Sequence, residues 1–194
     1  MKPTTAHYRD LFDAIENDDQ DLVLSVLKAY PESAHWRGRS LDRTGLMVAA
    51  AENNSALVRM FMEHGSDPFA QQWAGGSALI IATGNGEEAL ETVRVLLEFP
   101  QDLNNLEAHG GILPLWKALQ NEDNEAMVEL LVDAGANPNI PGRRNDDEPI
   151  YLSVEREESP EMNDCIRKAK VKWDAANLSN NTTVVSRHAR KPSL

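Results

Sequence analysis

Short clusters of apolar residues, each closed by a small residue, recur along the chain at a nearly constant spacing. They occupy residues 11–14, 46–49, 79–82 and 115–118, with a weaker copy at 150–153. The fourth positions of these clusters lie 35, 33, 36 and 35 residues apart. A period of this length indicates a repeat protein in which each copy is one supersecondary unit.

A second apolar run follows each cluster with the spacing of a helix. In the second unit this run contains Leu57, Val58, Phe61 and Met62, whose side chains share one helical face. The run ends at residues 65–68, Gly-Ser-Asp-Pro, because glycine accepts a left-handed cap and proline cannot continue a helix. The predicted unit is therefore helix, turn, helix and loop. One unit cannot bury its own apolar face, so several must stack into a continuous core.

Two units carry a more specific pattern. Residues 44–50 read Thr-Gly-Leu-Met-Val-Ala-Ala, and residues 128–139 form an apolar run that ends in Gly-Ala-Asn-Pro-Asn. The first segment resembles the Thr-Pro-Leu-His-x-Ala-Ala motif of the ankyrin-repeat family, and the second resembles that family's second helix with its Gly-Ala-Asp ending. The resemblance covers roughly residues 8–156. It implies an all-α solenoid of stacked helix-turn-helix units with finger loops.

The resemblance also divides the chain. An ankyrin-repeat domain is expected at 1–158, a C-terminal helix at 159–176 and a flexible tail at 177–194. The units are expected near 8–38, 39–71, 72–107 and 108–142, with a partial cap at 143–158. The C-terminal helix is predicted from apolar residues spaced four, three and four apart, namely Met162, Ile166, Ala169 and Trp173. The tail is poor in residues that form cores and rich in Asn, Ser and Thr.

The chain departs from the family pattern at one position in every unit. The family histidine is replaced by Met47, Ile80, Trp116 and Tyr151. The hydrogen bonds that this histidine makes in the family must therefore be lost or replaced. We expect Trp116 to pack inside its helix, and Trp36 to be a spacer between stacked helices.

Charge changes the picture of possible partners. The chain carries a net charge of −12, which divides into −18 for residues 1–165 and +6 for residues 166–194. The negative charge of residues 1–165 disfavours binding to nucleic acid and anionic membranes and favours a basic partner. The same charge is also explained by a need for solubility alone. No apolar stretch approaches the length of a membrane span, and no signal sequence is expected. The single cysteine suits a cytoplasmic protein.

The residue types that commonly act in catalysis, histidine and cysteine above all, are scattered along the sequence with no catalytic spacing. His64 precedes a helix-ending glycine and is predicted to be a cap, whereas His109 is predicted at a loop tip, either exposed or in contact with a partner. Arg167 and Lys168 are basic neighbours that lower a thiol pKa, but Cys165 has no recognisable base and is expected to be structural. The acidic clusters lack the spacing of a calcium loop. The sequence therefore predicts neither an enzyme nor a cofactor or metal site.

The family resemblance implies binding along a concave surface made of finger loops and the exposed side of the first helices. Trp73, at a predicted finger tip, is either an apolar anchor for a partner or packed back on the adjacent finger. The finger arginines either pair with nearby acids or face an acidic patch on the partner. The predicted contact residues are Arg39, Leu41, Arg43, Glu52, Gln72, Trp73, Asn85, His109, Ile112, Gln120, Asn121, Arg143, Arg144, Asp147 and Arg156.

Two functional hypotheses follow. The first is a dedicated inhibitor of one basic protein, since a small acidic ankyrin protein resembles bacterial immunity proteins that bind a cognate toxin. The second is a regulatory adaptor or scaffold that holds a partner without inhibiting it. Loss of the partner's activity on binding distinguishes the first hypothesis from the second.

Overall fold

A computed structural model describes residues 5–38, 41–121, 124–142, 149–150 and 160–185. Its helices and 3-10 turns are α1 (Thr5–Glu16), α2 (Gln20–Ala29), η1 (Pro31–His35), α3 (Gly45–Ala51), α4 (Ser55–Glu63), α5 (Ala78–Thr83), η2 (Gly86–Ala89), α6 (Leu90–Leu97), η3 (Glu107–His109), α7 (Pro114–Ala118), α8 (Glu125–Asp133) and α10 (Pro160–Val185). The only bridges of strand type in the described ranges are Arg37 with Thr44 and Pro141 with Pro149. The predicted all-α class is confirmed.

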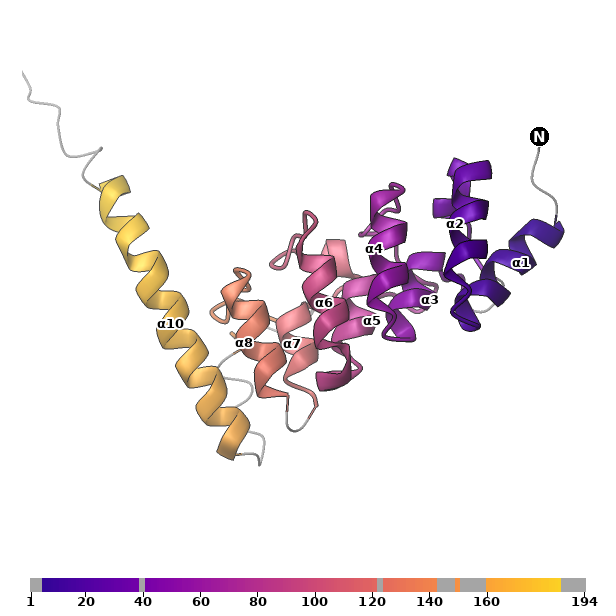
Figure 1. Ribbon diagram of the computed structural model, residues 1–194. Coiled ribbons are helices and arrows are strands. Elements are labelled where there is room, and N and C mark those ends of the chain that lie inside the picture. The colour runs from indigo at the N-terminus through magenta and orange to yellow at the C-terminus, as the bar shows by residue number, and fades with distance from the viewer. Residues whose placement is uncertain (1–4, 39–40, 122–123, 143–148, 151–159, 186–194) are drawn as a thin grey trace, which may run out of the picture.

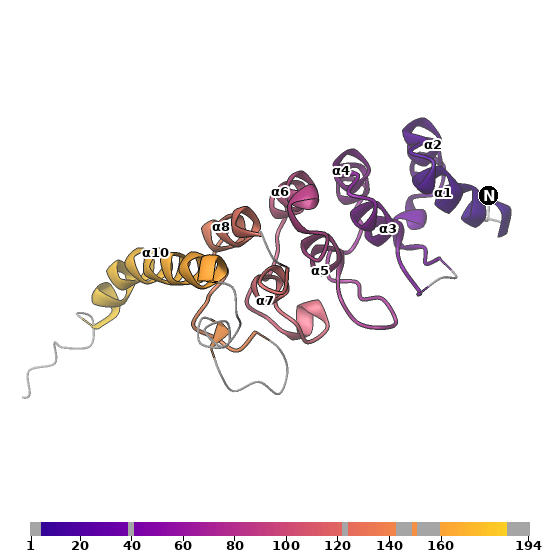
Figure 2. The same cartoon turned by 90° about the horizontal axis from the view of Figure 1, so that it is seen from below.

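The helices form two layers (Figures 1 and 2). The first helices of the units, α1, α3, α5 and α7, make one layer, and the second helices, α2, α4, α6 and α8, make the other. Loops project from the side of the first helices, as Figure 2 shows. Each unit packs on the next, with α3 against α5 and α4 against α6. The arrangement is the predicted solenoid.

Side-chain caps fix where several helices begin. The oxygens of Asp19, Thr44, Asn54 and Ser77 each accept a hydrogen bond from the backbone N–H three residues further on. A cap of this kind satisfies one of the four N–H groups that have no partner at a helix start and contributes about 1 kcal/mol. Such caps fix the starts of α2, α3, α4 and α5, whereas α6, α7 and α8 begin without a side-chain cap.

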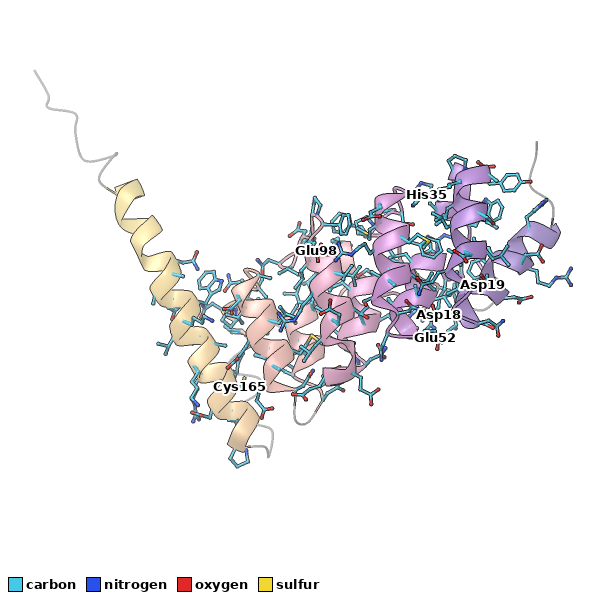
Figure 3. All side chains as sticks on the ribbon, in the orientation of Figure 1. Asp18, Asp19, His35, Glu52, Glu98 and Cys165 are labelled. Carbon is cyan, nitrogen blue, oxygen red and sulfur yellow. The ribbon has the colours of Figure 1, made fainter. Side chains whose placement is uncertain are left out.

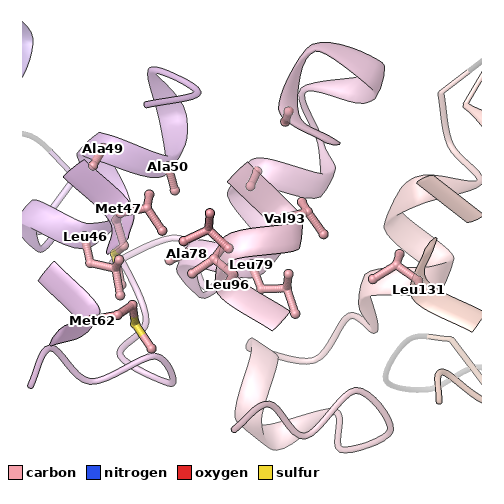
Figure 4. Close-up of a cluster of buried hydrophobic side chains, with 14 of the residues drawn as sticks. Leu46, Met47, Ala49, Ala50, Met62, Ala78, Leu79, Val93, Leu96 and Leu131 are labelled. Carbon is pink, nitrogen blue, oxygen red and sulfur yellow. The ribbon is translucent and has the colours of Figure 1, made fainter. Parts of the chain in front are cut away.

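One apolar core runs along the stack. Leu46, Leu79 and Leu96 are fully buried in it, and Figure 4 shows such side chains from successive units in a continuous row. Ala49 and Ala50 are also fully buried, as expected for methyl groups that allow neighbouring helices to approach closely. The core thus crosses every boundary between the described units, as expected for a stack whose units stabilise one another.

The residues at the family histidine position have become core residues. Met47, Ile80 and Trp116 are all buried, so the predicted packing of Trp116 is confirmed. Trp36 is buried too, with its ring tilted against that of Tyr30 at a centroid separation of 6.0 Å. Tyr151 lies outside the described residues.

Helix α10 covers the end of the stack beyond α8 (Figure 1). Cys165, Ile166 and Ala169 are buried in this contact, and Lys172 makes an ion pair with Asp133 of α8. The helix continues to Val185, past the predicted boundary at 176, so the first part of the predicted tail is helical. No helix of the described ranges combines the length and the apolar composition that crossing a bilayer requires.

Candidate protein-binding surface

Three loops that project from the layer of first helices make up most of the described finger surface. We name them the first finger (37–38 and 41–44), the second finger (69–76) and the third finger (105–112). Together with the exposed side of the first helices they form what we call the front face. The layer of second helices forms the back face.

Hydrogen bonds tie the first finger to the second. The backbone N–H of Trp73 donates to the carbonyl oxygen of Leu41 at 3.0 Å, and Nε of Arg43 donates to Oε1 of Gln72 at 2.8 Å. Arg43 and Gln72 were predicted as partner contacts, and the structure places both half-buried and bonded to each other. Arg37 strengthens the same junction, because its Nη1 donates to the carbonyl oxygen of the second finger's Gln71 at 2.9 Å.

The second finger is also held from its other side. Nε2 of Gln71 donates to the carbonyl oxygen of Glu107 at 2.6 Å. Gly110 has a φ of +74°, and a Cβ added there would lie 2.4 Å from the backbone nitrogen of Gly76. Glycine is therefore required at 110 both by its conformation and by the close approach of the two backbones. The tip of the second finger stands between two fixed neighbours.

Two apolar side chains protrude from these fixed tips. Trp73 is 85% exposed and Leu41 is 45% exposed. The alternative that Trp73 folds back on the adjacent finger is wrong, because such packing would bury the indole. Leu41 has a φ of +54° and Asp42 a φ of +55°, in the left-handed region that side chains with a Cβ rarely adopt.

His109 corrects a prediction. It was expected at a loop tip, exposed or in contact with a partner, but its side chain is fully buried. Its Nε2–H donates to the carbonyl oxygen of Asp102 at 2.7 Å, and its Nδ1 lies 2.9 Å from Oγ of Ser77, the residue that caps α5. His109 therefore forms a buried hydrogen bond with the hydroxyl that caps the first helix of the preceding unit. Burial lowers its pKa, while the Asp102 carbonyl opposes that shift.

Ile112, another predicted contact, lies half-buried against the core. The sequence pattern offers no signal for the burial of either residue, since both flank Gly110 and Gly111 in what reads as an ordinary loop. The partner that fixes His109, Ser77 at the start of α5, lies 32 residues away in the sequence.

In three of the units, an asparagine in the turn between the two helices donates a side-chain hydrogen bond to the preceding unit. Nδ2 of Asn54 donates to Oδ1 of Asp18 at 2.6 Å, Nδ2 of Asn85 donates to the carbonyl oxygen of Ala51 at 3.0 Å, and Nδ2 of Asn121 donates to the carbonyl oxygen of Gly84 at 3.1 Å. Each bond joins one unit to the preceding one. Asn85 and Asn121, predicted as partner contacts, thus have a structural role in stacking. Gln120 is exposed, and its Oε1 accepts from Nζ of Lys117 at 3.4 Å.

Exposed carboxylates line the front face of the first two units. We name Asp13 and Glu16 of α1 and Glu52 at the end of α3 the acidic row. Within the described ranges none of the three makes an ion pair.

Further acids continue this edge at the turn between α1 and α2, and Figure 3 shows Asp18 and Asp19 beside Glu52. The amide hydrogen bonds from Asn54 and Gln20 lower the pKa of Asp18. Asp18 therefore remains charged well into the acid range, which keeps this edge negative.

Five predicted contact residues lie outside the described residues. They are Arg39, Arg143, Arg144, Asp147 and Arg156. Of the predicted finger arginines the structure therefore describes only Arg43, whose Nε donates to the amide oxygen of Gln72 and not to an acid. Arg37, at the base of the first finger, does pair with an acid, since it contacts Oδ2 of Asp42 at 2.9 Å.

The other residues considered for catalysis, His64 and Cys165, have structural roles. His64 caps the end of α4, with Nδ1 2.8 Å from the carbonyl oxygen of Met60, as predicted. Cys165 is buried beneath α10, and burial followed by Glu125 and Glu129 raises its pKa to about 11, although Lys168 lowers it. Loss of solvent outweighs the effect of the basic neighbour, and the buried thiol agrees with the expected structural cysteine. No group of three His, Cys, Asp or Glu side chains within the described ranges is arranged to hold a metal ion.

The comparisons with known proteins agree with this architecture. A comparison with curated proteins gave no match. A family model described as "Ankyrin repeats (3 copies)" matches residues 11–106 and again residues 46–142. Repeats of this kind indicate a module for protein–protein interaction. Because the matched segments span more than half of the sequence, the chain belongs to the ankyrin-repeat family.

Proposed function

We propose that this chain is a non-catalytic module that binds one basic protein through its front face and inhibits that protein. The observation that carries the proposal is the acidic row, in which Asp13, Glu16 and Glu52 are exposed and make no ion pair within the described ranges. Charges placed in this way are available to a partner and are not used to stabilise the fold. Complementary charge speeds association and excludes partners of the same sign.

The charge of the whole chain supports the same partner chemistry. Residues 1–165 carry −18, so the field around the repeats attracts cationic surfaces over the Debye length, about 8 Å at physiological salt. Binding through the front face covers the corresponding surface of the partner, which is the basis for proposing inhibition. An adaptor that leaves the partner active is the competing outcome.

The test begins with partner capture and ends with an activity assay. The immobilised chain is exposed to lysate of its source cells, the retained protein is identified by mass spectrometry, and its affinity is then measured in purified form. Neutralising the acidic row with Asp13→Asn, Glu16→Gln and Glu52→Gln should weaken binding about tenfold, because three exposed pairs of roughly 0.5 kcal/mol each sum to about 1.5 kcal/mol.

A matched variant controls for net charge. Glu63→Gln, Glu91→Gln and Glu129→Gln remove the same charge from exposed positions of the back face. This control should keep nearly full affinity. Equal losses in both variants would mean that only the net charge matters, and absence of any retained partner would refute the proposed function. Full partner activity in the saturated complex would favour the adaptor.

A further inference from the structure

The most exposed large apolar group of the described residues stands beside a second one. Trp73 is 85% exposed at the tip of the second finger, and Leu41 is 45% exposed at the tip of the first. The N–H of Trp73 donates to the carbonyl oxygen of Leu41, so the two residues are neighbours by a direct backbone bond of 3.0 Å. We name these two side chains the apolar tip.

The backbone under the apolar tip is fixed before any partner arrives. Arg43 bonds to Gln72 across the two fingers, and Gln71 bonds to the third finger. A side chain on such a support loses little backbone freedom when it is buried in a complex, which lowers the entropic cost of association. Tryptophan adds a large contact area with only two side-chain torsions to fix.

The backbone conformation at the apolar tip gives a second, independent indication. Leu41 occupies the left-handed region at a φ of +54°, where glycine or asparagine is the favoured residue. Its side chain gains little by packing, because nearly half of it is exposed. Backbone strain of this kind accumulates at binding sites.

We propose that Leu41 and Trp73 insert together into an apolar pocket on the partner, while basic groups elsewhere on the partner face the acidic row. This inference rests on the proposed function and specifies the shape of the partner's site. A side chain that stands 85% exposed is buried only by a concave surface. Tryptophan in a pocket of this kind is the commonest form of interface hot spot.

Other occupants are less compatible with the structure. A second copy of this chain would bring a body of charge −18 against an equal one, and the like charges repel. Helix α10 lies at the opposite end of the stack from α1 and the first finger (Figure 1), so its described part does not reach the apolar tip. A basic partner protein remains the occupant that charge and position favour.

The test uses the basic protein retained by the wild-type chain, purified and titrated against variants. Trp73→Ala should weaken binding about 30-fold or more, the size of a hot-spot loss. Leu41→Asn should also weaken binding, yet leave the chain equally or more resistant to urea, because asparagine tolerates the left-handed conformation. Leu22→Ala is the matched control, since Leu22 is 39% exposed but lies on α2 of the back face, and it should bind normally.

A cross-link locates the contact on the partner. With Trp73→p-benzoylphenylalanine, the photo-cross-linked partner peptide should line an apolar concave site. Normal binding by both tip variants, while the acidic-row variant binds weakly, would overturn this inference and leave the proposed function standing. A cross-link to a flat polar surface, or dimers of the chain that Trp73→Ala disrupts, would also overturn it. If the wild-type chain retains no partner, both proposals fail.

Discussion

Protonation of His109 should destabilise the fold in mildly acidic solution. The carbonyl of Asp102 only accepts hydrogen bonds, so the proton of the neutral ring resides on Nε2. Nδ1 then accepts from the hydroxyl of Ser77, whose oxygen in turn accepts from the N–H of Ile80. A second proton on Nδ1 would displace the Ser77 hydroxyl hydrogen and charge a fully buried ring.

The sign of the effect follows from the direction of the pKa shift. Burial lowers the pKa of His109 in the folded chain below its ordinary value of 6.5, so the unfolded chain binds the proton first as the pH falls. The stabilising contribution is complete above pH 6.5 and decreases below it. A ring that stays neutral in the folded chain sets the upper limit: the loss between about pH 7.5 and 5.5 is at most about 1.4 kcal/mol, which lowers Tm by no more than about 3–5 °C for a chain of this size.

Urea unfolding followed by far-UV circular dichroism measures this loss. Wild type and His109→Gln are compared at pH 7.5, 6.5 and 5.5, because glutamine keeps a donor and an acceptor but does not titrate. The variant should be less stable at pH 7.5 by about 1–3 kcal/mol, since the ring's packing and hydrogen bonds are lost. The difference between the two chains should narrow towards pH 5.5, and the other histidines cancel in this comparison. Parallel stability curves for the two chains would refute the reasoning.

Two further predictions concern backbone contact and thiol chemistry. Gly110→Ala should cost about 1–3 kcal/mol in urea unfolding, because its Cβ would meet the nitrogen of Gly76. Gly86→Ala shares a positive φ but has no atom within 4 Å, so it should cost less, and equal losses would contradict the close approach. Cys165 should react with iodoacetamide at pH 8 at least 100-fold faster in urea than in the folded chain, since its pKa rises from 9.0 to about 11 on folding. Similar rates would contradict its burial.

The repeat, the helix pairs and several caps were predictable because they depend on residues close in sequence. The spacing of the apolar clusters, together with the glycine after His64, was enough to place α3, α4 and the end of α4. His109 could not be placed in this way, because its partner Ser77 is 32 residues away and the local Gly-rich sequence favours a loop. The burial of His109 depends on contacts between successive units, so the sequence around residue 109 contains no pattern that predicts it.

The boundary of the C-terminal helix was missed for a different reason. Residues 177–185 are mostly Asn, Ser, Thr and Val, which are weak helix formers and favour a prediction of tail. Burial of Cys165, Ile166 and Ala169 against α8 offsets the unfavourable free energy of helix nucleation. Each residue added to the helix after that forms one more backbone hydrogen bond at a small cost in entropy. Propensity alone therefore underestimates a helix that is nucleated by tertiary contact.

The predicted front-face residues divide according to whether the fold itself uses them. The amides of Asn85 and Asn121 bond to the preceding unit, and His109 bonds to Ser77, so family position alone overstates the binding surface. The side chains of the acidic row and the apolar tip have no comparable role in stacking. Exposed charge acts mainly on the rate of association, whereas a buried aromatic anchor acts mainly on the rate of dissociation. Under the proposed function, the row selects a basic partner at a distance and the tip holds it.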